Sequence, residues 1–96
     1  MSLFTLTREN DEKDIILISK ALGSETRFQI LKILKENNTS YSITELAQKL
    51  KQTEANISSQ VKKLEKVGLV QASYKPGNHG VIKLISLNFE KITILF

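Results

Sequence analysis

Residues 51–69, KQTEANISSQVKKLEKVGL, decide the fold, because they predict a helix with only a thin apolar stripe. At about 100° per residue, three apolar side chains fall together on the side that would face a core: Ile57, Val61 and Leu64. The opposite side begins with small residues and ends with lysines: Ala55, Ser59, Lys62 and Lys66. No acidic residue interrupts this outward side, whereas ordinary solvated helices tend to carry Glu–Lys pairs at i, i+4. A plain solvated face is the alternative explanation.

A shorter helix is predicted immediately before this one, over residues 43–50. Ser42 and Glu45 have the spacing of a capping box, in which each side chain bonds the other residue's backbone N–H. The apolar positions recur at helical intervals: Ile43, Leu46, Ala47 and Leu50. After a brief turn, Thr53 can cap the second helix, residues 54–67. The sequence therefore predicts two short helices joined by a tight turn.

After Gly68, which ends the second helix, the hydrophobic period changes to that of strands. Residues 69–75 and 81–87 predict the two strands of a β-hairpin, joined by a five-residue tip over residues 76–80. The tail, residues 91–96, is rich in β-branched residues and predicts a third strand, with a short helix as the alternative.

The first part of the chain contributes three more predicted elements. Residues 2–7 are β-prone and predict either a short strand or a frayed end. As a strand, they can pair with the tail of the same chain or of another copy. A helix capped by Asn10 runs to about Leu22 and is apolar almost all round, which favours a dimer contact in a chain this small. A further helix covers residues 25–37. The predicted dimer interface consists of Ile15, Ile16, Ile18, Leu22 and, from the tail, Phe96.

The composition of the 96 residues fits one domain, residues 1–96, and excludes several classes of protein. The absence of cysteine excludes disulfides and thiolate metal sites, and a single histidine leaves no catalytic or metal-binding cluster in view. We therefore expect no enzyme activity, no metal site and no cofactor. The N-terminus lacks the features of a signal peptide, and no apolar run approaches the ~20 residues of a membrane span. We expect a cytoplasmic protein without membrane contact.

The net charge of +4 belongs entirely to the second half of the chain. Residues 1–50 contain seven basic and seven acidic residues, whereas residues 51–96 contain seven basic and three acidic ones. This distribution favours a surface that faces a polyanion, with solubility charge as the alternative.

Two helices, a tight turn and a basic hairpin predict a mainly α fold with a small β-hairpin (α+β), the winged helix-turn-helix. The helix-turn-helix would occupy about 43–67 and the wing about 69–87, in a domain of four helices and a two- to three-stranded antiparallel wing sheet. The second helix of such a pair lies in the DNA major groove. The predicted contacts to double-stranded DNA are Thr53, Glu54, Asn56, Ser58, Ser59, Lys62, Lys63, Lys66, Lys75, Asn78 and His79.

These predicted contacts divide by chemistry. The amide and hydroxyl groups can bond base edges, and the lysines can neutralise phosphates. Glu54 can accept a hydrogen bond from cytosine, although a role in the first helical turn suits it better. The hairpin residues can contact phosphate or enter the minor groove, with an ordinary exposed turn as the alternative. Arg27 can contact phosphate or form structural hydrogen bonds.

Three stretches of the sequence resemble winged-helix repressors of the ArsR type. ALGSETRFQIL, residues 21–31, is similar to the family's N-terminal signature. ITELA, residues 43–47, and NISSQVKKLEKVGLV, residues 56–70, resemble its helix-turn-helix. The resemblance covers roughly residues 14–87 and implies a homodimer on an imperfect inverted repeat, with Ser58, Ser59 and Gln60 near the bases. It also favours the structural role for Arg27.

Two departures from the family pattern alter these expectations. The best-known members sense metals through cysteines, which this chain lacks, so that mode of sensing cannot apply. Many members also add a long dimerising helix after the hairpin, so we expect dimerisation mainly through residues 11–22. The leading hypothesis is a sequence-specific transcriptional regulator, most simply a homodimeric repressor. The alternative is a winged-helix protein-interaction module that docks another protein.

Overall fold

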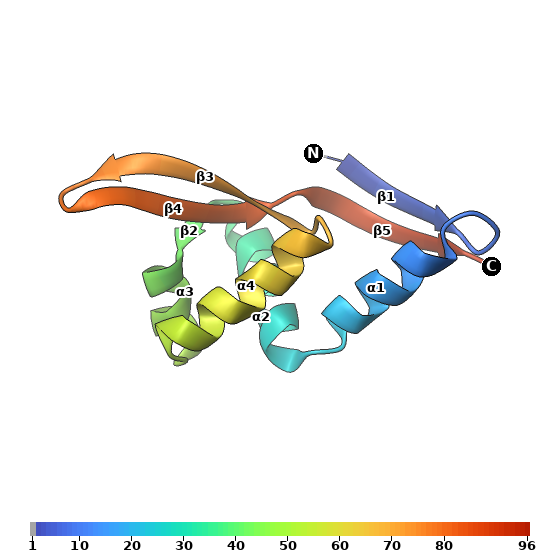
Figure 1. The fold of residues 1–96 in the computed structure, drawn as a ribbon, viewed down its shortest axis with the longest axis horizontal. Coiled ribbons are helices and arrows are strands. Elements are labelled where there is room, and N and C mark those ends of the chain that lie inside the picture. Colours follow the sequence, from blue (N-terminus) through green and yellow to red (C-terminus); the bar gives the residue numbers. More distant parts are fainter. Residues whose placement is uncertain (1) are drawn as a thin grey trace.

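The computed structural model describes the backbone of residues 2–96 and the side chains from residue 4 onward. The helices lie along one side of an extended layer of strands (Figure 1). The molecule measures 49 × 23 × 21 Å. The elements follow one another as β1 (Ser2–Thr7), α1 (Glu12–Leu22), α2 (Glu25–Asn37), β2 (Tyr41–Ser42), α3 (Ile43–Leu50), α4 (Glu54–Lys66), β3 (Val70–Gly77), β4 (Gly80–Leu87) and β5 (Phe89–Leu95). The predicted α+β winged helix-turn-helix is confirmed.

The wing is a three-stranded antiparallel sheet in the order β2-β4-β3. Its third strand is the short β2, where Tyr41 pairs with Ile85, and not the tail of the chain. The hairpin tip is also tighter than predicted, because Gly77 pairs with Gly80 and only two residues, Asn78 and His79, lie between them. Gly80 has φ +120, a conformation that glycine adopts freely. The predicted five-residue tip was therefore too long.

The two ends of the chain form a second, two-stranded sheet, in which β1 and β5 run parallel. The predicted tail strand is confirmed, and so is its pairing with residues 2–7 of the same chain. Phe4 and Phe89 meet edge to face with ring centroids 6.0 Å apart. Arg8 extends the pairing, because its backbone N–H donates to the Leu95 carbonyl at 2.8 Å. This sheet reaches beyond the wing sheet along the long axis of the molecule (Figure 1).

The core lies between the helices and the wing sheet. Its fully buried side chains come from α2, α3, α4, the turn after α4 and the wing strand β4: Ile30, Leu34, Leu46, Ile57, Val61, Leu64, Leu69 and Ile85. Because the three apolar residues of α4 are all completely buried, the thin stripe predicted for that helix is sufficient to hold it on the domain.

Helix α1 begins one residue later than predicted. Asp11, not Asn10, is its N-cap, and the Asp11 carboxylate accepts a hydrogen bond from the Thr7 backbone N–H at 2.8 Å instead of capping the helix. Ile18 and Ala21 are buried on its inner face, while Ile16 and Leu17 are about half exposed. Within the fold, α1 therefore has a buried face and a solvent-facing side that still carries apolar side chains.

Candidate nucleic-acid interface

Helices α3 and α4 are joined by a turn that the backbone fixes. Lys51 adopts the left-handed conformation with φ 56, and the next residue, Gln52, donates its N–H to the Ala47 carbonyl at 3.0 Å. The Thr53 hydroxyl then caps α4 by accepting the Asn56 N–H at 3.1 Å. The Ser42–Glu45 capping box at the start of α3 is complete, as predicted. These local bonds set the direction in which α4 leaves the turn.

The outward side of α4 is open to solvent. Small residues occupy its first half and lysines its second half, and all five are exposed: Ala55, Ser59, Lys62, Lys63 and Lys66. Ser58 is half-buried at the edge of this side. Glu54 is exposed, but its carboxylate accepts a hydrogen bond from the Thr44 hydroxyl and so links the first turns of α3 and α4. The exposed side is therefore small and neutral at one end and positively charged at the other.

A chain of side-chain hydrogen bonds runs along the flank of α4. Asn56 donates to Gln52 at 2.9 Å and accepts from Gln60 at 3.1 Å. Gln60 in turn accepts from the Arg27 guanidinium at 2.7 Å. Asn56 is therefore half-buried and already bonded within the protein, although it retains one amide N–H for another partner.

Arg27 anchors the other end of this chain to α1. Its Nε donates to the Ala21 carbonyl at 2.8 Å and its Nη2 to the Lys20 carbonyl at 3.1 Å, two carbonyls in the last turn of α1. The predicted structural role of Arg27 is confirmed. That it also reaches α4 through Gln60 was not predicted, because the bond joins residues far apart in the sequence.

The three wing residues predicted to contact DNA, namely Lys75, Asn78 and His79, are all exposed to solvent. Lys83, on the returning strand, is instead paired with Glu65 of α4 at 2.7 Å, with both side chains about one-third exposed. This ion pair ties the wing to the C-terminal half of α4. It also satisfies the acidic residue of α4 nearest the lysines, which leaves their positive charge available.

The predicted dimer residues differ in their accessibility. Ile16 is 47% exposed and Phe96 is 87% exposed, so both offer apolar surface. Ile15 and Leu22 are half-buried, and Ile18 is only 3% exposed because it packs within its own chain. Leu17 and Leu95, which were not among the predicted residues, are also about half exposed.

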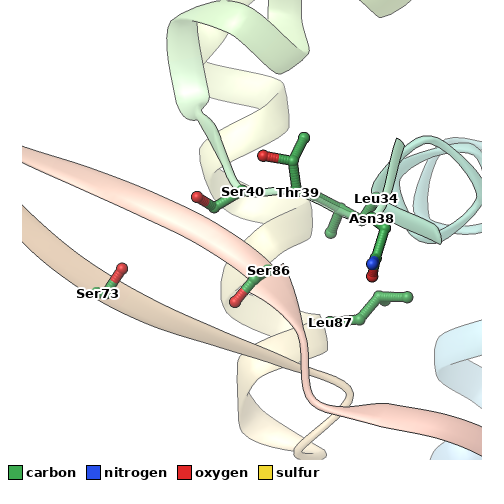
Figure 2. Close-up of a pocket in the computed structure, with 7 residues that line it drawn as sticks. All are labelled: Leu34, Asn38, Thr39, Ser40, Ser73, Ser86 and Leu87. Carbon is green, nitrogen blue, oxygen red and sulfur yellow. The ribbon is translucent and has the colours of Figure 1, made fainter. Parts of the chain in front are cut away.

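A hollow of about 280 Å³ lies between the end of α2 with its following loop and the wing strands. Figure 2 shows the residues that line it. The hollow is lined by uncharged residues, four of them hydroxyl-bearing: Leu34, Asn38, Thr39, Ser40, Ser73, Ser86 and Leu87. Across residues 2–96, no three histidine or carboxylate side chains gather in a way that could hold a metal ion. Among the helices described, none is long and apolar enough to cross a membrane.

The tight helix pair, the exposed basic side of its second helix and the antiparallel hairpin define a winged helix-turn-helix DNA-binding protein. The chain belongs to the arsR family of bacterial regulatory proteins, whose model matches residues 24–72. It is therefore a transcriptional regulator, and the resemblance noted in its sequence is confirmed. No curated protein sequence matches the chain significantly.

Solved structures of similar fold agree with this assignment. Reduced HlyU from Vibrio cholerae is 25% identical with a TM-score of 0.69, covering 83% of this chain and 78% of its own. The transcriptional regulator HlyU from Vibrio vulnificus is 26% identical with a TM-score of 0.65, covering 86% of this chain and 80% of its own. A homodimeric winged helix-turn-helix DNA-binding domain from Mycobacterium bovis is 20% identical with a TM-score of 0.70, covering 84% and 69%. At 20% identity, the Mycobacterium bovis domain is evidence for the shared fold only.

Proposed function

We propose that this protein is a homodimeric repressor that binds an imperfect inverted repeat in double-stranded DNA. One α4 would enter the major groove of each half-site, and the bound dimer would block access to a promoter. The observation that carries the proposal is the outward side of α4, which is exposed along its length, small at its N-terminal end and basic at its C-terminal end. Such a helix can sink into a groove about 12 Å wide and place its lysines near phosphates.

The residues of this surface would share the work unequally. Ser59 is exposed and Ser58 and Asn56 are half-buried, so we assign base reading first to Ser59, with the other two beside it. Lys62, Lys63 and Lys66 would supply affinity by neutralising phosphates (Figure 1 shows the helix that carries them). Thr53 and Glu54 already form hydrogen bonds within the protein that hold the start of α4. We therefore assign both residues to positioning α4 at the edge of the major groove.

The wing would contact the flanking DNA. Lys75, Asn78 and His79 project from a hairpin of two eight-residue strands, which supports phosphate or minor-groove contacts next to each half-site.

The dimer would form through α1 and the chain ends beside it. Ile15, Ile16 and Leu22 supply apolar surface on α1, and Phe96 adds a large exposed ring. Ile18 would support this surface from beneath, since it is buried. The homodimeric state of the Mycobacterium bovis domain agrees with such an assembly. Without cysteine, signal detection by a thiolate metal site does not apply, and we propose a cytoplasmic regulator that needs no cofactor for DNA binding.

A gel-shift titration on the DNA upstream of the protein's own gene tests the proposal. We expect site-specific binding that weakens steeply with salt, since each neutralised phosphate releases counterions. Lys62→Ala should weaken binding to all sequences nearly uniformly and lower the salt slope by about one, whereas Ser59→Ala should act mainly on site preference. Lys13→Ala, an exposed lysine on α1, is the matched control. Equal affinity for operator and random DNA at every salt concentration would refute the proposal.

A further inference from the structure

A groove of about 250 Å³ lies between α1 and the C-terminal half of α4, and we call it the α1–α4 groove. Its apolar floor is formed by Leu17, Ala21 and Val67. Four basic residues surround that floor, namely Lys20, Arg27, Lys63 and Lys66. No acidic side chain lines it among the residues that the structure describes.

We propose that the α1–α4 groove binds a small amphiphilic anion, a carboxylate with a short apolar chain, and that the bound anion weakens DNA binding. The four cations require an anionic group, and the three apolar residues require a part of the ligand that carries no charge. A volume slightly below the ~300–1,000 Å³ of sites for drug-sized ligands selects a small molecule. The regulatory half of this inference rests on the proposed function, whereas the binding site itself does not.

Arg27 is the residue best suited to hold the anionic group. Of the five N–H groups of a guanidinium, three donate to Ala21, Lys20 and Gln60. The remaining two have no partner within the described part of the chain, one on each terminal nitrogen. A planar guanidinium bonds carboxylate oxygens in pairs, and the three existing bonds hold this one in place beside the floor.

The floor of the groove is not accounted for by the other proposed partners. A DNA backbone can meet the lysines, but it offers little apolar surface to Leu17, which is 50% exposed. The dimer surface lies elsewhere on α1: at about 100° per residue, Leu17 and Ala21 fall on one flank of the buried Ile18, and Ile15 and Leu22 on the other. A second copy docked over Ile15 and Ile16 would thus leave the groove open.

Occupation of the groove would act on DNA binding by two routes. Lys63 and Lys66 line the groove and are also assigned to phosphates, so a bound anion competes for their charge. Arg27 also bonds Gln60 on α4, so an anion on its two free N–H groups lowers the positive charge at the end of the hydrogen-bond chain that reaches Asn56. Both routes lower DNA affinity.

The binding half is tested on the free protein by NMR titration of the isotope-labelled chain with sodium octanoate, with acetate and 1-octanol as half-ligands. We expect saturable shifts of the amides of Leu17, Ala21 and Val67, with octanoate at least about tenfold tighter than either half-ligand. If acetate bound as tightly as octanoate, the basic residues alone would account for binding. If 1-octanol bound as tightly as octanoate, the apolar floor alone would account for it. Either result, or the absence of saturation, overturns the proposal.

Paired variants locate the site. Leu17→Gln should weaken octanoate binding about tenfold, whereas Ile16→Gln, a neighbouring residue of similar exposure on the same helix, should not. Lys20→Gln should weaken it as well, with Lys13→Gln as the control. If both members of a pair behave alike, the anion binds elsewhere and the inference fails.

The regulatory half is tested by repeating the gel shift at saturating octanoate. We expect at least a threefold loss of DNA affinity in the wild-type protein, and none in Leu17→Gln, which lies outside the proposed DNA contacts. Unchanged affinity in the wild type overturns the regulatory half. A protein that binds no DNA even without octanoate refutes the proposed function instead, and the NMR titration still decides whether the site exists.

Discussion

Arg27 is the residue at which three helices of the domain are joined. It lies in the first turn of α2, holds two carbonyls at the end of α1 and reaches Gln60 on α4. Because its side chain is half-buried, these bonds are partly protected from water. A single arginine thus connects the helix proposed for dimerisation with the helix proposed for DNA reading.

Replacement of Arg27 should therefore cost more than the loss of a surface charge. Arg27→Ala should lower the free energy of unfolding by about 2 kcal/mol, since it removes three hydrogen bonds from a charged donor. Lys32→Ala, on the exposed side of the same helix, loses only an ion pair at 3.9 Å and should change stability by less than about 0.5 kcal/mol. Urea denaturation measures both, and equal losses would contradict the assigned role.

Glu45 gives the protein a predictable response to acid. The backbone N–H of Ser42 donates to its carboxylate, and this bond is the main reason that the pKa of Glu45 lies below its ordinary value. A carboxyl group whose pKa is lowered by folding stabilises the folded protein at pH values above its ordinary pKa of about 4.3. This stabilisation is lost as the pH falls through the lowered pKa of the folded state. Glu45→Gln should flatten the acid side of the stability profile measured by denaturation. Glu36→Gln, at an exposed position of α2, is the control. If the stability of the two variants depended on pH in the same way, the role assigned to Glu45 would be refuted.

At the scale of elements, the end of α4 fixes where the wing begins. The Gly68 N–H donates to the Glu65 carbonyl and the Leu69 N–H to the Leu64 carbonyl, the two bonds of a Schellman motif. Gly68 has φ +80, and the next residue, Leu69, is completely buried. The glycine therefore turns the chain directly from α4 into the core and the first strand of the hairpin, β3.

Two glycines at helix ends offer a matched test of this turn. Gly68→Ala should destabilise the protein by about 1–2 kcal/mol, the cost of the left-handed conformation for a residue with a side chain. Gly23 ends α1 with φ −76, so Gly23→Ala should be neutral or stabilising by up to about 1 kcal/mol. Thermal unfolding compares the two, and a similar loss for both would show that the conformation at Gly68 is not the cause.

The elements that could be predicted from the sequence are those whose signals are local. The capping box at Ser42, the cap at Thr53 and the stop at Gly68 placed α3 and α4 within a residue or two. Strand β2 was missed because it has only two residues and its partner, β4, lies some forty residues later in the chain. Asn10 was chosen as a cap although Asp11 takes that position, since both residue types suit it.

The candidate site shows the same division. The angular count identified which residues of α4 face outward, because that depends only on helical period. The bonds of Asn56 and Gln60 depend on where Arg27 lies in space, 33 residues away from Gln60, so the sequence could not show that Asn56 is partly engaged. Likewise, the pattern of α1 marked it as apolar all round, but only packing separates the buried Ile18 from the exposed Ile16.

At the scale of the whole molecule, the paired chain ends and α1 form a region separate from the wing. Parallel pairing of β1 with β5 brings the last residues beside the start of α1, and Arg8 holds the Phe96 carbonyl at 3.0 Å (Figure 1). Exposed apolar side chains gather in this region, while the exposed lysines of α4 and the wing lie on other elements. A substitution in this region can therefore perturb assembly without altering any of the proposed DNA contacts.

Ile16→Glu tests this separation, because it places a carboxylate in the proposed dimer contact without touching α4. Burying that charge should raise the dimer dissociation constant at least about tenfold, measured by light scattering over a dilution series. A monomer would meet half the phosphates, so the salt slope of DNA binding should fall by about half. Thr39→Glu, in the exposed loop after α2, changes the net charge equally and should alter neither quantity. An Ile16→Glu protein that remains dimeric with an unchanged slope would show that α1 is not the dimer helix.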